Sequence, residues 1–171
     1  YYVKAYAVNS AGVAYSDVVS FKTLASTPVV NTVGASAITP TSAVLSGTVA
    51  TDNGAAITER GCVYLKGTEA PTTSSNKVKV EGTLGDFTAS LADLEPNQKD
   101  SYRAYAINAK GTSYGDIMNF STSVSLPTLS AMKVSIITTT SATFTCTVTN
   151  HGGETVSEVG FYYSKEESVD V

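Results

Sequence analysis

Few residues in this sequence have the chemistry of a catalytic or metal-binding group. The chain contains two cysteines, Cys62 and Cys146, and a single histidine, His151. A hydroxyl or thiol nucleophile needs a base such as this histidine within hydrogen-bond reach. Calcium needs about six to eight oxygens, which Asp52 and Asn53 could supply in part. A second acidic group lies near residue 171 (Glu166, Glu167 and Asp170). Each candidate has a competing structural explanation, which depends on the elements around it.

An internal repeat gives the chain its organisation. Residues 5–23 read AYAVNSAGVAYSDVVSFKT and residues 104–122 read AYAINAKGTSYGDIMNFST, at an offset of 99 positions. Aligned without a gap at this offset, residues 5–66 and 104–165 share 24 identities in 62 positions. A fixed period of this kind indicates a repeated structural module.

The period predicts one complete module over 25–123. Residues 1–24 are then the last strands of a preceding module, and residues 124–171 are the first strands of a following one. We expect the sequence to be a fragment of a longer array, because a lone two-stranded hairpin leaves its apolar face uncovered. Two completions are open. Either further residues complete both end segments, or a second copy docks head to tail, with the 1–24 hairpin on the 157–166 strand.

Composition and hydrophobic period both predict an all-β fold. Only 15% of the residues are charged, and 21 Ser and 24 Thr make up about a quarter of the chain. Apolar and polar residues alternate along several short runs (43–49, 60–64, 87–91 and 102–107), which is typical of half-buried strands. Turn-forming residues separate these runs. Short strands with one apolar face each predict a two-sheet sandwich.

Charge and hydropathy exclude two partner classes. The net charge is −4, whereas nucleic-acid binding requires a basic face. No apolar stretch reaches the length of a membrane span, so we expect no membrane-spanning element in this segment.

Several motifs together resemble the fibronectin type III family, as found in tandem in secreted and surface proteins of Bacteroidetes-type bacteria. Pro28 stands where the first strand begins, and Pro40–Ser46 resembles the second-strand signature. Leu91-x-x-Leu94-x-Pro96 resembles the corner before the sixth strand, and the final two strands are matched by 102–108 and 117–122. The resemblance implies immunoglobulin-like sandwiches in tandem.

The function that the resemblance implies is non-catalytic. The resemblance implies a structural or adhesive array, which acts as a spacer or as a protein- or glycan-interaction module. The array belongs to an exported protein located extracellularly or at the cell surface. The neighbouring modules of the chain are its partners, a protein or glycan is a possible further one, and no cofactor is implied. The alternative is a set of glycan-binding accessory modules of a polysaccharide-processing enzyme.

Two positions depart from the family pattern. The family places a buried Trp on the second strand, where this chain has Gly47 and, in the next repeat, Cys146. The family also places a Tyr at the corner, six residues after the Leu of Leu-x-Pro. The preceding repeat has Tyr1 there, but the complete module has Asp100. We therefore expect a looser corner in residues 25–123.

The repeat favours structural roles for the reactive side chains. Cys62 aligns with Phe161 and Cys146 with Gly47, so the two thiols are expected in the cores of different modules, reduced and buried. His151 aligns with Asp52 in a turn between the second and third strands. The complete module contains no histidine, which argues against a His-dependent reaction carried by the repeat.

The best sequence evidence for binding is an aromatic and cationic face. If Tyr102, Ala104 and Ala106 point into the core, then Arg103, Tyr105 and Ile107 point outward. The preceding repeat places Lys4 and Tyr6 at equivalent positions. A cation beside an exposed Tyr could stack on a sugar or a partner chain. The competing interpretation is a cross-strand pair that only shields the sheet.

Overall fold

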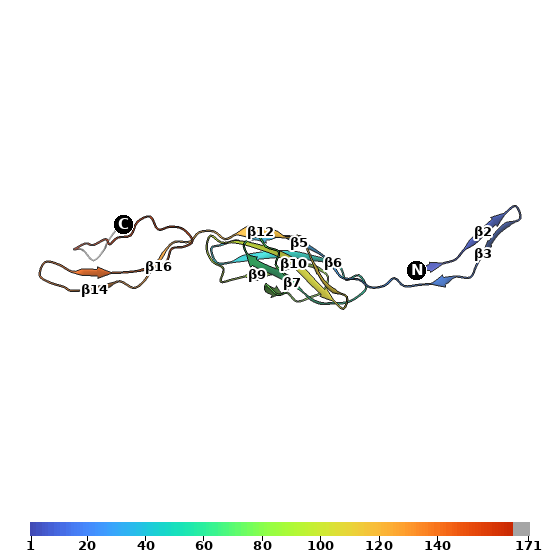
Figure 1. The fold of residues 1–171 in the computed structure, drawn as a ribbon, viewed down its shortest axis with the longest axis horizontal. Helices are drawn as coiled ribbons and strands as arrows, with labels where there is room; N and C mark the ends of the chain where they lie inside the picture. The colour runs from blue at the N-terminus through green and yellow to red at the C-terminus, as the bar shows by residue number, and fades with distance from the viewer. Residues whose placement is uncertain (166–171) are drawn as a thin grey trace.

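The computed structural model describes residues 1–165. Every element from β1 to β16 is a strand, which confirms the predicted all-β fold. A central sandwich is flanked by two extended hairpins at opposite ends of its long axis (Figure 1).

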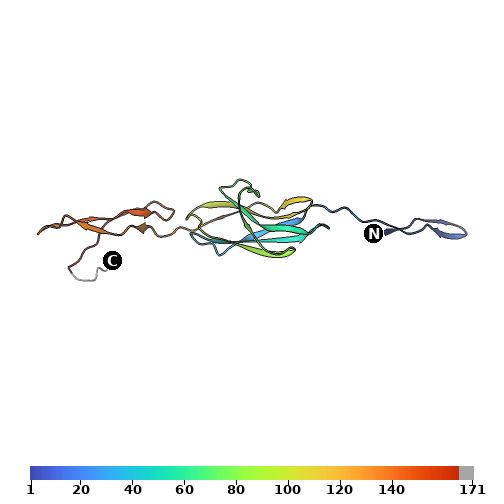
Figure 2. The same ribbon diagram turned by 90° about the horizontal axis from the view of Figure 1, so that it is seen from below.

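The sandwich consists of two antiparallel sheets. One has the order β5 (Val29–Ser36), β6 (Ala43–Thr51) and β9 (Gly85–Leu91). The other has the order β11 (Gly111–Tyr114), β10 (Lys99–Asn108), β7 (Ile57–Lys66) and β8 (Asn76–Lys79). β12 (Met118–Ser121) also pairs with β10. Figure 2 shows the two layers from the side.

The core lies between the sheets and follows the predicted alternation. On β6, Ala43, Leu45, Gly47 and Val49 are buried, and the residues that alternate with them are half-buried. On β10, Tyr102, Ala104 and Ala106 belong to the same core, as the sequence predicted. Alternation decides these faces because successive strand side chains point to opposite sides of a sheet.

Gly47 occupies the family's Trp position because its neighbours leave no room for a side chain. A Cβ there would lie 2.6 Å from the Cβ of Ala104 and 2.8 Å from the ring of Phe87. The Phe87 ring, which comes from the neighbouring strand β9 of the same sheet, fills this part of the core.

The final strand is interrupted, so the sequence missed β11. At the break, a Cβ on Gly115 would lie 2.4 Å from the backbone nitrogen of Thr32, so only glycine fits. The Thr32 hydroxyl accepts a hydrogen bond from the Ala104 backbone N–H at 3.0 Å, which ties β5 to β10. In the preceding repeat, the Ser16 hydroxyl accepts the equivalent bond from Ala5 N–H at 2.9 Å.

The N-terminal hairpin pairs β1 (Tyr2–Val3) with β4 (Val19–Ser20) and β2 (Tyr6–Asn9) with β3 (Gly12–Tyr15). Its side chains are exposed.

The C-terminal hairpin pairs β13 (Thr128–Leu129) with β16 (Val148–Asn150) and β14 (Lys133–Ser135) with β15 (Thr143–Thr145). The sequence predicted a third strand over 157–166, but residues 157–165 form none. Their counterpart at the offset of 99, β7, pairs with β8 and β10.

Candidate functional site

The predicted ligand face lies on the outer side of the β10–β7 sheet, but it is not open. Arg103 and Ile107 are half-buried, and Tyr105 has an exposed fraction of 0%. The prediction that Tyr105 is an exposed aromatic is therefore wrong. Alternation correctly predicted that these side chains point away from the core. The sequence did not indicate that another segment of the chain lies against this face.

The covering segment is the loop 67–75 between β7 and β8. Its residue Pro71 is fully buried, and the Pro71 carbonyl accepts a hydrogen bond from Arg103 Nε at 2.7 Å. The Tyr114 hydroxyl accepts a bond from Thr73 N–H at 3.0 Å, and the Ser101 hydroxyl donates to the Glu69 carbonyl. These bonds anchor the loop to Ser101 and Arg103 on β10 and to Tyr114 on β11, which is the register partner of Tyr105.

A cation–aromatic pair holds this loop and recurs in the repeat. The guanidinium carbon of Arg103 lies 3.9 Å from the centre of the Tyr114 ring. At the equivalent positions, Lys4 Nζ lies 4.0 Å from the centre of the Tyr15 ring. Tyr114 was not predicted, although the repeated tyrosines 15 and 114 could have indicated it. Loop 67–75 was not predicted because residues 73–99 have no counterpart at the offset of 99, and 67–72 share no identity with 166–171.

Lys4 and Tyr6 lie apart from the other candidates. They belong to the N-terminal hairpin, well separated from the sandwich (Figure 1). Tyr6 is 72% exposed, and its ring centre lies 6.4 Å from that of Tyr15. The five predicted site residues thus form two separate groups, of which only the Arg103, Tyr105 and Ile107 group is covered.

The buried Tyr105 hydroxyl is satisfied by a charged network. It donates to Glu59 at 2.8 Å, and Glu59 also pairs with Lys77 at 3.0 Å and with Lys79. The bonds from Lys79 and then Lys77 lower the pKa of Glu59 to about 2, so this carboxylate stays charged at neutral pH. Burial, and then the bond to Glu59, raise the pKa of Tyr105. The phenol is therefore a hydrogen-bond donor, and its role here is structural.

The two thiols are free and differ in burial. Cys62 is buried in the core, and burial raises its pKa to about 12, so it stays a protonated thiol. Cys146 is only half-buried, which corrects the prediction that both are buried. It donates to the Ser130 carbonyl at 3.2 Å within the C-terminal hairpin.

His151 is a turn residue, as the repeat predicted. In the complete module, Gly54 N–H donates to the Asp52 carboxylate at 2.9 Å. In the C-terminal hairpin, Gly153 N–H donates to Nδ1 of His151 at 3.3 Å, so the imidazole takes the place of the carboxylate.

Residues 1–165 contain no group of three or more His, Cys, Asp or Glu that could hold a metal ion. The Asn53 amide, one of the candidate calcium ligands, donates to the Thr27 carbonyl at 2.7 Å. Glu166, Glu167 and Asp170 lie outside the described residues.

The corner residue Asp100 is a buried acid in an unfavourable place. It is 2% exposed, and within the described part of the chain its Oδ2 has no hydrogen-bond partner. Burial raises the pKa of Asp100, Lys66 opposes this shift and Glu95 adds to it. The corner is tied instead by the Thr122 hydroxyl, which donates to the Glu95 carbonyl at 2.6 Å and accepts from Gln98 N–H at 2.9 Å.

Replacing Asp100 by Asn is expected to stabilise the module by about 1 kcal/mol at pH 7, because a buried, unpaired charge is removed. A raised folded-state pKa means that the folded state binds the proton more tightly, so the acid costs no stability below its unfolded value of 3.8. The cost develops as the pH rises from there through the folded pKa. Thermal unfolding at pH 3 and pH 7 measures this. Asp93→Asn, at an exposed site, is the control, and an equal gain at both pH values would contradict the prediction.

Strands β5 to β12 therefore form an immunoglobulin-like β-sandwich of the fibronectin type III kind. No protein-family description matches the chain, and no curated protein matches it. None of the described residues forms a helix long and apolar enough to cross a membrane.

Solved structures with a similar fold come from unrelated settings. The FN1–FN3 domains of chicken CNTN1 are 16% identical over 71% of this chain and 42% of that chain, with a TM-score of 0.45. Domains A168–A170 of titin are 20% identical over 67% of this chain and 38% of theirs, with a TM-score of 0.39. The sensor domain of the anti-sigma factor RsgI4 of Pseudobacteroides cellulosolvens is 22% identical over 57% of this chain and 96% of that chain, with a TM-score of 0.41.

Proposed function

We propose that this chain is a non-catalytic spacer segment within a tandem array of an exported surface protein. In this array, residues 25–123 are one module, residues 1–24 are the last strands of the module before it, and residues 124–171 are the first strands of the module after it. Two observations support this proposal. Loop 67–75 is bonded to the outer face of the β10–β7 sheet, and the two ends of the sandwich are hydrogen-bonded to the chain segments that enter and leave it.

The contacts at the two ends of the sandwich support a mechanical role. At the N-terminal pole, the buried amide of Asn108 donates to the Ser26 carbonyl at 2.8 Å and to the Asp52 carbonyl at 3.0 Å. At the C-terminal pole, Asn97 N–H donates to the Ser123 carbonyl at 3.1 Å. The chain enters and leaves the sandwich at opposite ends of the long axis (Figure 1). A force along an array would therefore reach the folded module through bonded linkers.

Pulling on the chain from its two ends tests the mechanical role. The 25–123 module should unfold in one cooperative event that extends the chain by roughly 300 Å, since each extended residue spans about 3.4 Å. Gradual extension without such an event would contradict the spacer function.

Binding to arrays of immobilised glycans and surface proteins tests the adhesive role. A spacer should show no saturable retention, and Arg103→Ala should leave this unchanged. Saturable retention that is lost in Arg103→Ala would overturn the spacer function. If the retained ligand is a polysaccharide, the spacer function is replaced by that of a glycan-binding accessory module.

A further inference from the structure

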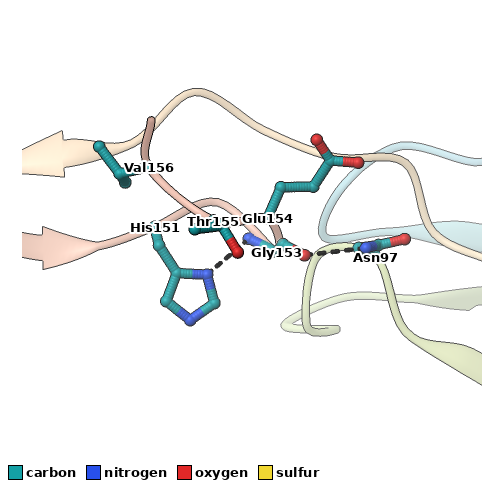
Figure 3. A pocket seen from close by; sticks show the side chains of 6 residues that line it. All are labelled: Asn97, His151, Gly153, Glu154, Thr155 and Val156. Atoms are coloured by element: carbon teal, nitrogen blue, oxygen red, sulfur yellow. Dashed lines mark hydrogen bonds between the residues drawn. The ribbon is translucent and has the colours of Figure 1, made fainter. Parts of the chain in front are cut away.

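The sandwich and the C-terminal hairpin touch at a small, specific contact. Asn97 lies in the corner loop between β9 and β10, and its Nδ2 donates to the Gly153 carbonyl at 2.8 Å. This bond closes one side of a shallow notch between the two units, which Figure 3 shows with the side chains that line it (Asn97, His151, Gly153, Glu154, Thr155 and Val156). The bond therefore joins two units that are separated by the linker 122–127, between β12 and β13.

The two surfaces approach too closely for any side chain at position 153. A Cβ on Gly153 would lie 2.6 Å from the Asn97 Cβ and 2.8 Å from the Pro96 carbonyl oxygen. Gly153 also has a φ of 92°, a conformation that favours glycine. The glycine therefore serves the turn and the contact together.

The linker is bonded to the same turn in both repeats. Ser125 N–H donates to the Gly152 carbonyl at 2.9 Å, and its counterpart Ser26 N–H donates to the Asn53 carbonyl at 3.2 Å. At the N-terminal pole of the complete module, the counterpart of Gly153 is Gly54. A Cβ there would meet only the linker residue Ala25, at 3.7 Å, so the docking surface of the Gly54 turn is free.

We propose that the Pro96-Asn97 corner of one module and the glycine turn of the next form a specific module-to-module contact that sets the angle of each joint. The partner of the free Gly54 turn is then the equivalent corner of a preceding module, with an asparagine or similar amide donor at the position of Asn97. This inference rests on the proposed array. It adds that the joints are docked rather than freely bending.

Residual dipolar couplings on the whole chain test the contact, because two rigidly joined units share one alignment tensor. In the wild type, residues 28–122 and the hairpin 128–150 should fit a single tensor. Asn97→Gly removes the amide while keeping its positive φ of 54°, and Gly153→Ala adds the clashing Cβ. In each variant, the two units should fit two different alignment tensors.

Two matched controls separate the contact from backbone effects. Asp93→Gly changes a residue of the same corner with a φ of 55°, and Gly67→Ala adds a Cβ at a φ of 93° with nothing within 4 Å. Both should keep the shared tensor. Independent tensors in the wild type, an unordered hairpin, or a shared tensor in Asn97→Gly and Gly153→Ala would overturn the inference. Cooperative unfolding in the pulling experiment would still support the spacer function in that case.

Discussion

Replacing Tyr105 by Ala is expected to lower the free energy of unfolding of the 25–123 module by about 3–5 kcal/mol, the usual cost of truncating a buried aromatic. Tyr105 is fully buried, and its hydroxyl donates a hydrogen bond to Glu59. Truncating the side chain leaves a cavity, and the Glu59 carboxylate loses one hydrogen-bond donor. Denaturant unfolding measures the change, and faster proteolysis within 67–75 should accompany it.

Two other tyrosine variants sharpen this test. Tyr105→Phe keeps the ring and should cost only about 1 kcal/mol, the value of one hydrogen bond. Tyr6→Ala removes the repeat counterpart, which is 72% exposed, and should leave the unfolding of the module within about 0.5 kcal/mol of the wild type. A stable Tyr105→Ala protein would mean that loop 67–75 does not cover this face, and would restore Tyr105 as a candidate ligand contact.

Replacing Arg60 by Met is expected to destabilise the module by about 2–3 kcal/mol, because bonds from a charged donor are lost while the aliphatic contact is kept. The buried guanidinium donates to four carbonyls of the loop 81–85, at 2.8 Å to Glu81 and between 3.0 and 3.3 Å to the next three bonded residues (Thr83, Leu84 and Gly85). Its Cζ lies 5.0 Å from the centre of the Phe87 ring. Arg60 thus fastens the segment that crosses from β8 to β9.

The expected drop in melting temperature is roughly 15 °C for a module of this size. Arg60→Lys should recover only part of it, since one ammonium cannot reach carbonyls spread around a planar guanidinium. Lys77→Met, which removes a half-exposed cation from the same sheet, serves as the comparison. If Arg60→Met and Lys77→Met lose equal stability, the carbonyl contacts of Arg60 contribute nothing.

The sequence by itself determined the all-β class and the two sides of the central strands β6 and β10. Alternation along β6 and β10 placed Leu45 and Tyr102 in the core, because a side-chain period of two is a property of the extended backbone. The offset of 99 identified His151 as a turn residue by its alignment with Asp52, while the module boundaries that it predicts belong to the proposed array. These inferences needed only local geometry and a second copy for comparison.

Only the tertiary structure decided what lies above each face. Loop 67–75 has no periodicity and no recognisable repeat copy here, so its sequence did not indicate that Pro71 would be buried. The same holds for Arg60, whose partners are backbone carbonyls more than twenty residues away. The contact of Asn97 with Gly153 likewise joins two turns across a linker. Backbone groups are the same at every residue, so which of them a side chain meets depends on how the chain folds back on itself, and a strand pattern cannot encode it.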